Sequence, residues 1–167
     1  HQDLSMARRA FEGLGLVKQN AYDGDGAQET YRDMIDFASE RDDTPMRISG
    51  LNKIGLVHAI FAGDSDAGLG ALDEAASIAD EAKNKDGLAE GCMYRCGIFT
   101  SAGEFGEARK FLDQAARIGG ELDSEEPLLY SKTHIANTMI FMTEYEEAWP
   151  LIEDALEEST SRGNLKY

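Results

Sequence analysis

Cys92 and Cys96 are the residues whose type and spacing come closest to reactive chemistry, and they are the only cysteines of the chain. Four positions apart on a helix, the two thiols would share one face and could in principle bind a metal ion. No third or fourth ligand lies nearby in the sequence, and a disulfide at this helical spacing would be strained. The pair is therefore predicted to pack as small apolar side chains, with no metal ion bound.

Two acidic stretches, DGDG at 23–26 and DSD at 64–66, resemble the beginning of calcium-binding loops. Such a loop needs a bidentate glutamate at its twelfth position. The twelfth residue counted from Asp23 is Met34, and from Asp64 it is Ala75. Both stretches are therefore predicted to be turns between helices and not metal sites.

Two glycine-rich stretches begin like a nucleotide-binding fingerprint, GLGLVK from Gly13 and GLGALD from Gly68. Both lack the third glycine and the preceding strand that a dinucleotide-binding loop requires. These glycines are predicted to be positions of close helix packing, and no cofactor is predicted.

The remaining candidates for catalysis are histidines and pairs of acids. His58 and His134 fall on different predicted helices, without a recognisable Ser, Cys or Asp partner. Isolated helical histidines are usually structural. Acid pairs such as Glu125–Glu126 are expected to face solvent in so acidic a chain. We therefore predict no catalytic residues and a protein that is not an enzyme.

The helices that would position these side chains are predicted from a sequence repeat that occurs four times. GEFGEARKFLDQAARI begins at Gly103, and similar stretches begin at Gly26, Gly63 and Thr143, so that the copies are spaced by 37, 40 and 40 residues. The apolar residues of a copy recur at helical spacing, with charged residues opposite. Each copy has an aliphatic residue and, three positions later, an alanine, at Ile35 and Ala38, Leu72 and Ala75, Leu112 and Ala115, and Ile152 and Ala155.

A second helical stretch precedes each copy, and signals for helix starts support this division. Pro45 follows Thr44 as an N1 proline follows an N-cap residue, and Thr143 with Glu146 fits a capping box. Pro150 should remove one backbone hydrogen bond about a turn into the last helix. The sequence therefore predicts a single all-α domain over residues 1–167. Its helix–turn–helix units are expected at about 5–43, 44–85, 86–122 and 124–163, and residues 164–167 resemble the start of a further helix.

The stretches AGEFGEARKFLDQA and MTEYEEAWPLIEDA resemble the second helix of the tetratricopeptide repeat (TPR) family. The tryptophan, leucine–glycine pair and tyrosine of the family's first helix are mostly absent here. The repeat of about 40 residues is also longer than the usual one of about 34. It is similar to the long repeats in arms of bacterial signalling ATPases and LuxR-type regulators. This resemblance implies a TPR-like α-solenoid, in which about four units stack into a right-handed superhelix with the first helix of each unit on the concave side.

The resemblance also implies a function, which is recognition of a peptide or protein segment in the concave groove by a non-catalytic interaction module or scaffold. The alternative is a ligand- or peptide-sensing regulatory arm of a larger signalling or transcription-regulator protein. The family's groove-facing positions, carried onto this chain, are Leu16, Asn20, Lys53, Val57, Glu90, Met93, Gly97, Tyr130, Thr133 and Asn137.

Net charge limits the partners of such a groove. The 32 acidic and 16 basic residues leave a formal charge of −16, which disfavours nucleic acid and anionic membranes and favours a neutral or basic partner. No run approaches the roughly 18 apolar residues of a spanning helix. Two cysteines argue against a disulfide framework and favour the cytoplasm.

Overall fold

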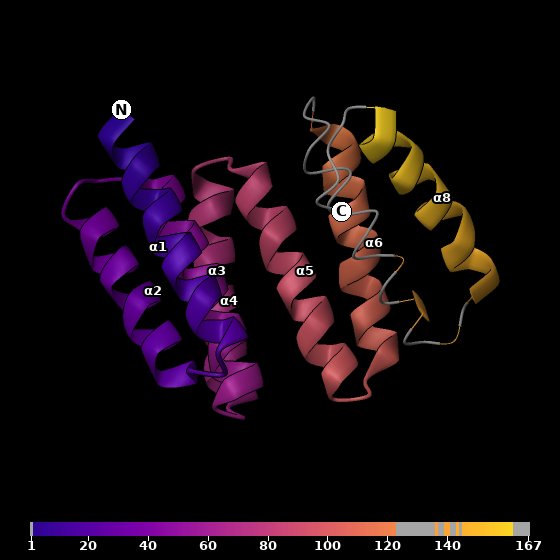
Figure 1. Ribbon diagram of the computed structural model, residues 1–167, viewed down its shortest axis with the longest axis horizontal. Coiled ribbons are helices and arrows are strands. Elements are labelled where there is room, and N and C mark those ends of the chain that lie inside the picture. Colours follow the sequence, from indigo (N-terminus) through magenta and orange to yellow (C-terminus); the bar gives the residue numbers. More distant parts are fainter. Residues whose placement is uncertain (1, 123–135, 137–138, 141–142, 144, 162–167) are drawn as a thin grey trace. The chain divides into compact units, whose positions relative to one another are not determined.

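The computed structural model of the chain describes residues 2–122, 136, 139–140, 143 and 145–161. These residues form helices and contain no strand, which confirms the predicted all-α class. The first helix expected in the fourth unit lies largely outside the described residues. The helices are α1 (Gln2–Asn20), α2 (Gly24–Ser39), α3 (Thr44–Phe61), α4 (Ser65–Glu81), α5 (Lys85–Ser101), α6 (Phe105–Glu121) and α8 (Tyr145–Ser161), as Figure 1 shows.

One turn geometry recurs between the helices. A residue with φ between 52° and 76°, in the left-handed region, stands two positions before each described helix from α2 to α8. A single residue of this kind reverses the chain after a helix. From the first to the fifth of these residues the spacing is 20 or 21 positions, and they are Tyr22, Asp42, Gly63, Lys83, Gly103 and Thr143. The repetition predicted from the similar stretches of sequence is therefore also a repetition of backbone conformation.

Short polar side chains cap α2, α4 and α5 after these turns. Asp23 accepts a hydrogen bond of 2.9 Å from the backbone N–H of Gly26, and Asp64 accepts one of 2.9 Å from Ala67. Asn84 does the same for Gly87, again at 2.9 Å. Each bond satisfies a donor that the first helical turn leaves free. The acidic stretches that resemble calcium loops are therefore helix caps.

Two of the predicted caps are displaced by one position or more. Asp43, and not Thr44, caps α3, since its carboxylate accepts from the backbone N–H of Met46 at 3.0 Å. Pro45 still lies in the first turn, as predicted. Thr143 has φ of 63° and belongs to the turn, and α8 begins at Tyr145.

The caps also correct the alignment of the first two copies. Asp23 and Asp64 occupy the same capping position and are 41 residues apart, whereas the alignment of the repeated stretches spaced these two copies by 37 residues. The first copy was therefore shifted by one helical turn, which leaves a helical stripe almost unchanged. In the corrected register the buried residues coincide, Ala27 with Gly68, Tyr31 with Leu72, Met34 with Ala75 and Ala38 with Ala79.

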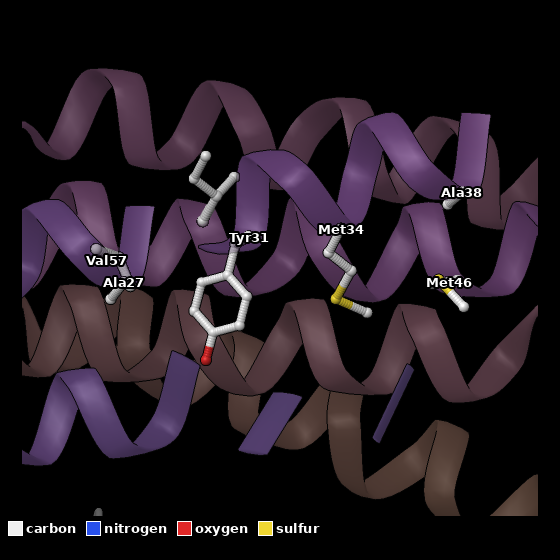
Figure 2. Close-up of a cluster of buried hydrophobic side chains, with 7 residues drawn as sticks. Ala27, Tyr31, Met34, Ala38, Met46 and Val57 are labelled. Carbon is white, nitrogen blue, oxygen red and sulfur yellow. The ribbon is translucent and has the colours of Figure 1, made fainter. Parts of the chain in front are cut away.

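The chain divides into two compact units, residues 1–87 and 88–167. In the first unit α1 packs on α2, α2 on α3, and α3 on α4. Its core lies mainly between α2 and α3, and Figure 2 shows a cluster of seven buried side chains in it, six of them labelled. The members, all less than 9% exposed, are Ala27, Tyr31, Met34, Ala38, Met46, Ile54 and Val57. Burial of these side chains supplies the main stabilisation of the unit.

Glycines let two of these helices approach closely. A Cβ atom on Gly55 of α3 would lie 2.8 Å from the carbonyl oxygen of Gly68 on α4. One on Gly68 would lie 2.7 Å from the oxygen of Gly55. The backbones of α3 and α4 are therefore in direct contact. Of the glycines predicted to be close-packing positions, Gly15 and Gly68 are, whereas Gly13 and Gly70 are exposed with nothing within 4 Å of an added Cβ atom, so the prediction was wrong for them.

The second unit buries two smaller clusters between α5, α6 and α8. Cys96, Ala108, Leu112 and Ala148 contribute to one of them. The other contains Ala89, Cys92, Met93, Ala115 and Ile118. The two cysteines are thus buried free thiols in separate clusters, which agrees with their predicted packing role.

The last helix continues through its proline. Pro150 is the sixth residue of α8, and the helix continues past it although proline has no backbone N–H group to donate. In the described part of the chain, no helix is long and apolar enough to cross a membrane.

Candidate functional site

Three polar side chains from α1 and α3 meet at the carboxylate of Glu12, and the four residues form what we term the Glu12 cluster. Arg8 Nε donates a hydrogen bond to Glu12 Oε1 at 2.9 Å, and Ser49 Oγ donates to the same oxygen at 3.0 Å. Lys53 Nζ lies 3.6 Å from this oxygen and donates to Ser49 Oγ at 3.0 Å. Two cations therefore face the Glu12 carboxylate in this cluster.

Helix geometry explains why these residues meet. Arg8 and Glu12 are four positions apart on α1, and Ser49 and Lys53 are four apart on α3, so each pair occupies one helix face. Both helices pack on α2 and are joined to it by short turns. They therefore run in the same direction, and the two pairs lie at the same level. Ser49 is 1% exposed, whereas the side chains of Lys53 and Glu12 are 14% and 28% exposed.

The charge on Glu12 is held in place by this environment. Burial, the largest single influence, raises the pKa of its carboxyl group. Three neighbours lower this pKa by more than burial raises it. They are Lys53 through its positive charge, Arg8 through its charge and its hydrogen bond, and Ser49 through its hydrogen bond. The pKa of Glu12 therefore lies below its ordinary value of 4.5.

A pH dependence of stability follows from this shift. Because the pKa of Glu12 is lower in the folded than in the unfolded chain, ionised Glu12 stabilises the fold above about pH 4.5, and this contribution is lost as the pH falls through the folded-state pKa. We expect Glu12→Gln to lower the free energy of unfolding at neutral pH by about 0.5–1.5 kcal/mol. The gap between variant and native chain should shrink in acid, as measured by urea unfolding.

Glu74→Gln provides the matched control for this prediction. Glu74 accepts from Arg47 at 2.8 Å, but both side chains are more than 40% exposed, and exposed pairs contribute little. Its stability should stay within about 0.5 kcal/mol of the native chain at each pH. A Glu12→Gln profile parallel to the native one would contradict the role of the carboxylate charge.

Exposed apolar side chains lie beside the Glu12 cluster, towards the C-terminal ends of the same two helices. Leu16, one turn after Glu12, is 54% exposed, and Ile60, about two turns after Lys53, is 46% exposed. We term the surface made by Glu12, Leu16, Lys53 and Ile60 the α1–α3 face. It combines a polar end, whose groups are already oriented by mutual hydrogen bonds, with two apolar side chains that are about half exposed.

The predicted groove residues of the first unit divide between this face and the core. Leu16 and Asn20 are exposed, and Lys53 is held in the Glu12 cluster. Val57 is 0% exposed and belongs to the core cluster between α2 and α3. Its side chain is therefore in the core and does not line an open groove, because α3 turns this position towards α2.

The candidates on α5 also differ in their surroundings. Met93 is 8% exposed and packs in the cluster with Ala115 and Ile118, so it contributes to the core. Glu90 is half-buried and accepts a hydrogen bond from Tyr94 Oη at 3.2 Å. Gly97 is half-buried, with open space where a Cβ atom would stand. The remaining candidates, Tyr130, Thr133 and Asn137, lie outside the described residues.

Sequence reasoning missed Arg8, Glu12, Ser49 and Ile60. The signal available for the first pair was its i, i+4 spacing of opposite charges. Ser49 gave no signal, because a serine in a helix is compatible with solvent, core or a side-chain hydrogen bond. Only the approach of α1 to α3 shows that Ser49 and Lys53 share one partner.

The histidine and cysteine that could be reactive are held by contacts within the fold. His58 Nδ1 lies 3.2 Å from Gln28 Nε2, which ties α3 to α2. Burial raises the pKa of the Cys92 thiol despite the charges of Arg95 and Arg117, which keeps it protonated and unreactive near neutral pH. Within the described ranges, no three His, Cys, Asp or Glu side chains gather as metal ligands.

The chain matches no protein-family model and no curated protein.

Proposed function

We propose that this chain is a TPR-like, non-catalytic interaction module that binds a peptide or protein segment across its α1–α3 face. The architecture proposed is the right-handed superhelix of the family, with the first helix of each unit lining the groove. The repeated left-handed turn and the buried positions that recur about every 40 residues are what a repeat of helical pairs would produce. Stacked helical pairs of this kind offer extended recognition surfaces.

The observation that carries the proposal is the composition of the α1–α3 face. Its charged groups are already ordered by hydrogen bonds. The side chains of Lys53 and Glu12 therefore lose little conformational entropy when a ligand binds to them. Leu16 and Ile60 add apolar area that becomes buried only when something covers it. Apolar contact beside fixed polar groups is how peptide-recognition surfaces obtain affinity and register.

Charge indicates the kind of segment that fits. The chain as a whole carries −16, so a neutral or basic segment is attracted to it. The Glu12 cluster itself has two cations and one carboxylate. The proposed ligand therefore places an uncharged part, with an apolar side chain, over the α1–α3 face and carries its basic residues elsewhere.

Selection from a phage-displayed random peptide library provides the test. Peptides selected on the native chain should be synthesised with a fluorophore and titrated by anisotropy. We expect Leu16→Asp and Ile60→Asp each to weaken binding at least about tenfold, because each puts a charge where an apolar side chain is buried. Both positions are exposed in the free chain, so both variants should fold.

Val17→Asp is the matched control. Val17 is 64% exposed on the same helix, but it points about 100° away from Leu16. Its affinity for the selected peptides should equal that of the native chain. Recovery of no binding peptide, or equal loss in all three variants, would contradict the proposal.

A further inference from the structure

The outer face of α1 carries a row of apolar side chains that lies in solvent. Met6, Leu14 and Val17 are 61%, 51% and 64% exposed, and Ala10 between them is exposed as well. Their spacing of four, four and three positions places all four on one side of the helix. Exposed apolar rows of this length mark interaction surfaces more often than isolated exposed residues do.

A row of similar residues at the same spacing occurs on α3, where it is buried. Forty positions further along the chain, Met46, Gly50, Ile54 and Val57 repeat the types and spacing of the α1 row. Met46, Ile54 and Val57 pack in the core with residues of α2. A Cβ atom on Gly50 would lie 2.7 Å from the Ile35 side chain of α2. The α1 row is therefore the kind of surface that this fold places against a helix like α2.

Helix α8 presents the complementary surface, also exposed. Tyr145, Trp149 and Leu156 are 60%, 60% and 57% exposed and lie on one helix face. The starts of α2 and α8 are 121 residues apart. At this spacing the three exposed residues of α8 correspond to Gly24, Gln28 and Ile35 of α2.

Each of these three positions on α2 contacts α3. A Cβ atom on Gly24 would lie 2.8 Å from Phe61 Cβ. Gln28 Nε2 lies 3.2 Å from the ring of His58, and Ile35 packs against Gly50. The residues that join α2 to α3 thus correspond to large apolar residues on α8 that lie in solvent.

The charges of the two surfaces are complementary. Helix α8 carries six acidic residues and no basic one, whereas α1 carries three basic and two acidic residues. The packed pair has the same asymmetry, since α2 carries four acidic residues and one basic, and α3 two basic and no acidic. Opposite net charges favour the pairing of α1 with α8 over the pairing of α8 with itself.

We propose that copies of this chain associate head to tail, with α1 of one copy packing on α8 of another as α3 packs on α2. The contact is heterologous, because it joins two different faces. It buries both apolar rows and brings an acidic helix against a basic one. It does not depend on the α1–α3 face, which lies on another side of α1.

The native chain provides the first measurement. Sedimentation velocity should show an average mass that rises with concentration up to about 1 mM. Trp149, the single tryptophan, lies on the proposed contact, so its emission should shift to shorter wavelength over the same range. A monomer at every concentration would overturn the proposal.

Mixing two variants tests the geometry of the contact. Val17→Glu introduces a charge on the α1 row and Leu156→Glu on the α8 row, and each variant alone should associate at least about tenfold more weakly than the native chain. Because each variant keeps the face that the other lacks, an equimolar mixture should form a dimer and no larger species. Absence of any complex in the mixture would overturn the head-to-tail arrangement.

Gln114→Glu is the control for added charge. Gln114 is exposed on α6 and belongs to neither row. This variant should associate as the native chain does, and equal weakening by all three substitutions would count against a specific contact. Circular dichroism melts establish that the variants are folded, and unchanged affinity of Val17→Glu for selected peptides keeps this test separate from that of the α1–α3 face.

Discussion

Leu72→Ala should lower the free energy of unfolding by about 2–5 kcal/mol, the largest effect we expect from any single truncation in the first unit. Leu72 is 0% exposed at the centre of α4. Its Cγ atom would lie 2.9 Å from a Cβ on Gly55, so the side chain fills the space directly against α3. Removal of three carbon atoms loses their transfer free energy and leaves a cavity.

The cavity cannot close by bringing the two helices together. The backbones of α3 and α4 already touch at Gly55 and Gly68 on the same side of α4. The cost of truncation is highest where the surroundings cannot relax, so a value in the upper half of the range is expected.

Denaturant unfolding followed by circular dichroism measures this effect. Leu16→Ala, in which a 54% exposed leucine is truncated on α1, is the control and should change stability by no more than about 0.5 kcal/mol. Similar losses in the two variants would mean that Leu72 is not in the core of α3 and α4.

A pair of glycine substitutions on α4 should have opposite signs. Gly68→Ala adds a Cβ atom 2.7 Å from the Gly55 carbonyl oxygen and 2.9 Å from the Ala59 Cβ. Neither is the flexible end of a side chain, so the two helices must separate. We expect a net loss of about 1–3 kcal/mol, although alanine is the better helix former.

Gly70→Ala makes the same chemical change two residues further along the same helix. Nothing lies within 4 Å of the added Cβ atom, and the position is exposed. Only the backbone effect remains, and stability should rise by about 0.4–1 kcal/mol. Thermal melts of the two variants beside the native chain are sufficient. A gain in both would mean that the contact of α3 with α4 is looser than described.

The sequence alone determined the helical class and the positions of several turns between helices. Pro45, the glycines at 63 and 103 and the acidic stretches at 23–26 and 64–66 all mark turns that the structure contains. These signals are local, because capping groups and left-handed residues act within one helical turn. The packing role of Cys92 and Cys96 also followed from the sequence, since no further ligand was near them.

Tertiary structure decided the register of the first copy. A shift of four residues rotates a helical stripe by only about 40°, so Ala38 and Ala75 aligned as well as Ala38 and Ala79 do. The capping carboxylates of Asp23 and Asp64, whose role depends on the observed hydrogen bonds, removed this ambiguity.

Tertiary structure likewise decided which residues of α3 face solvent. This helix contacts α2, α4 and, through Ser49 and Lys53, α1, so it is apolar around most of its circumference. In a helix with a single buried stripe, the period of the apolar residues predicts which side chains are in the core. In a helix that packs on several sides, it does not. Val57 was assigned to the groove from the family's groove-facing positions, and the periodicity of α3 could not correct this: Val57 is buried, while Ile60, three residues later, is 46% exposed.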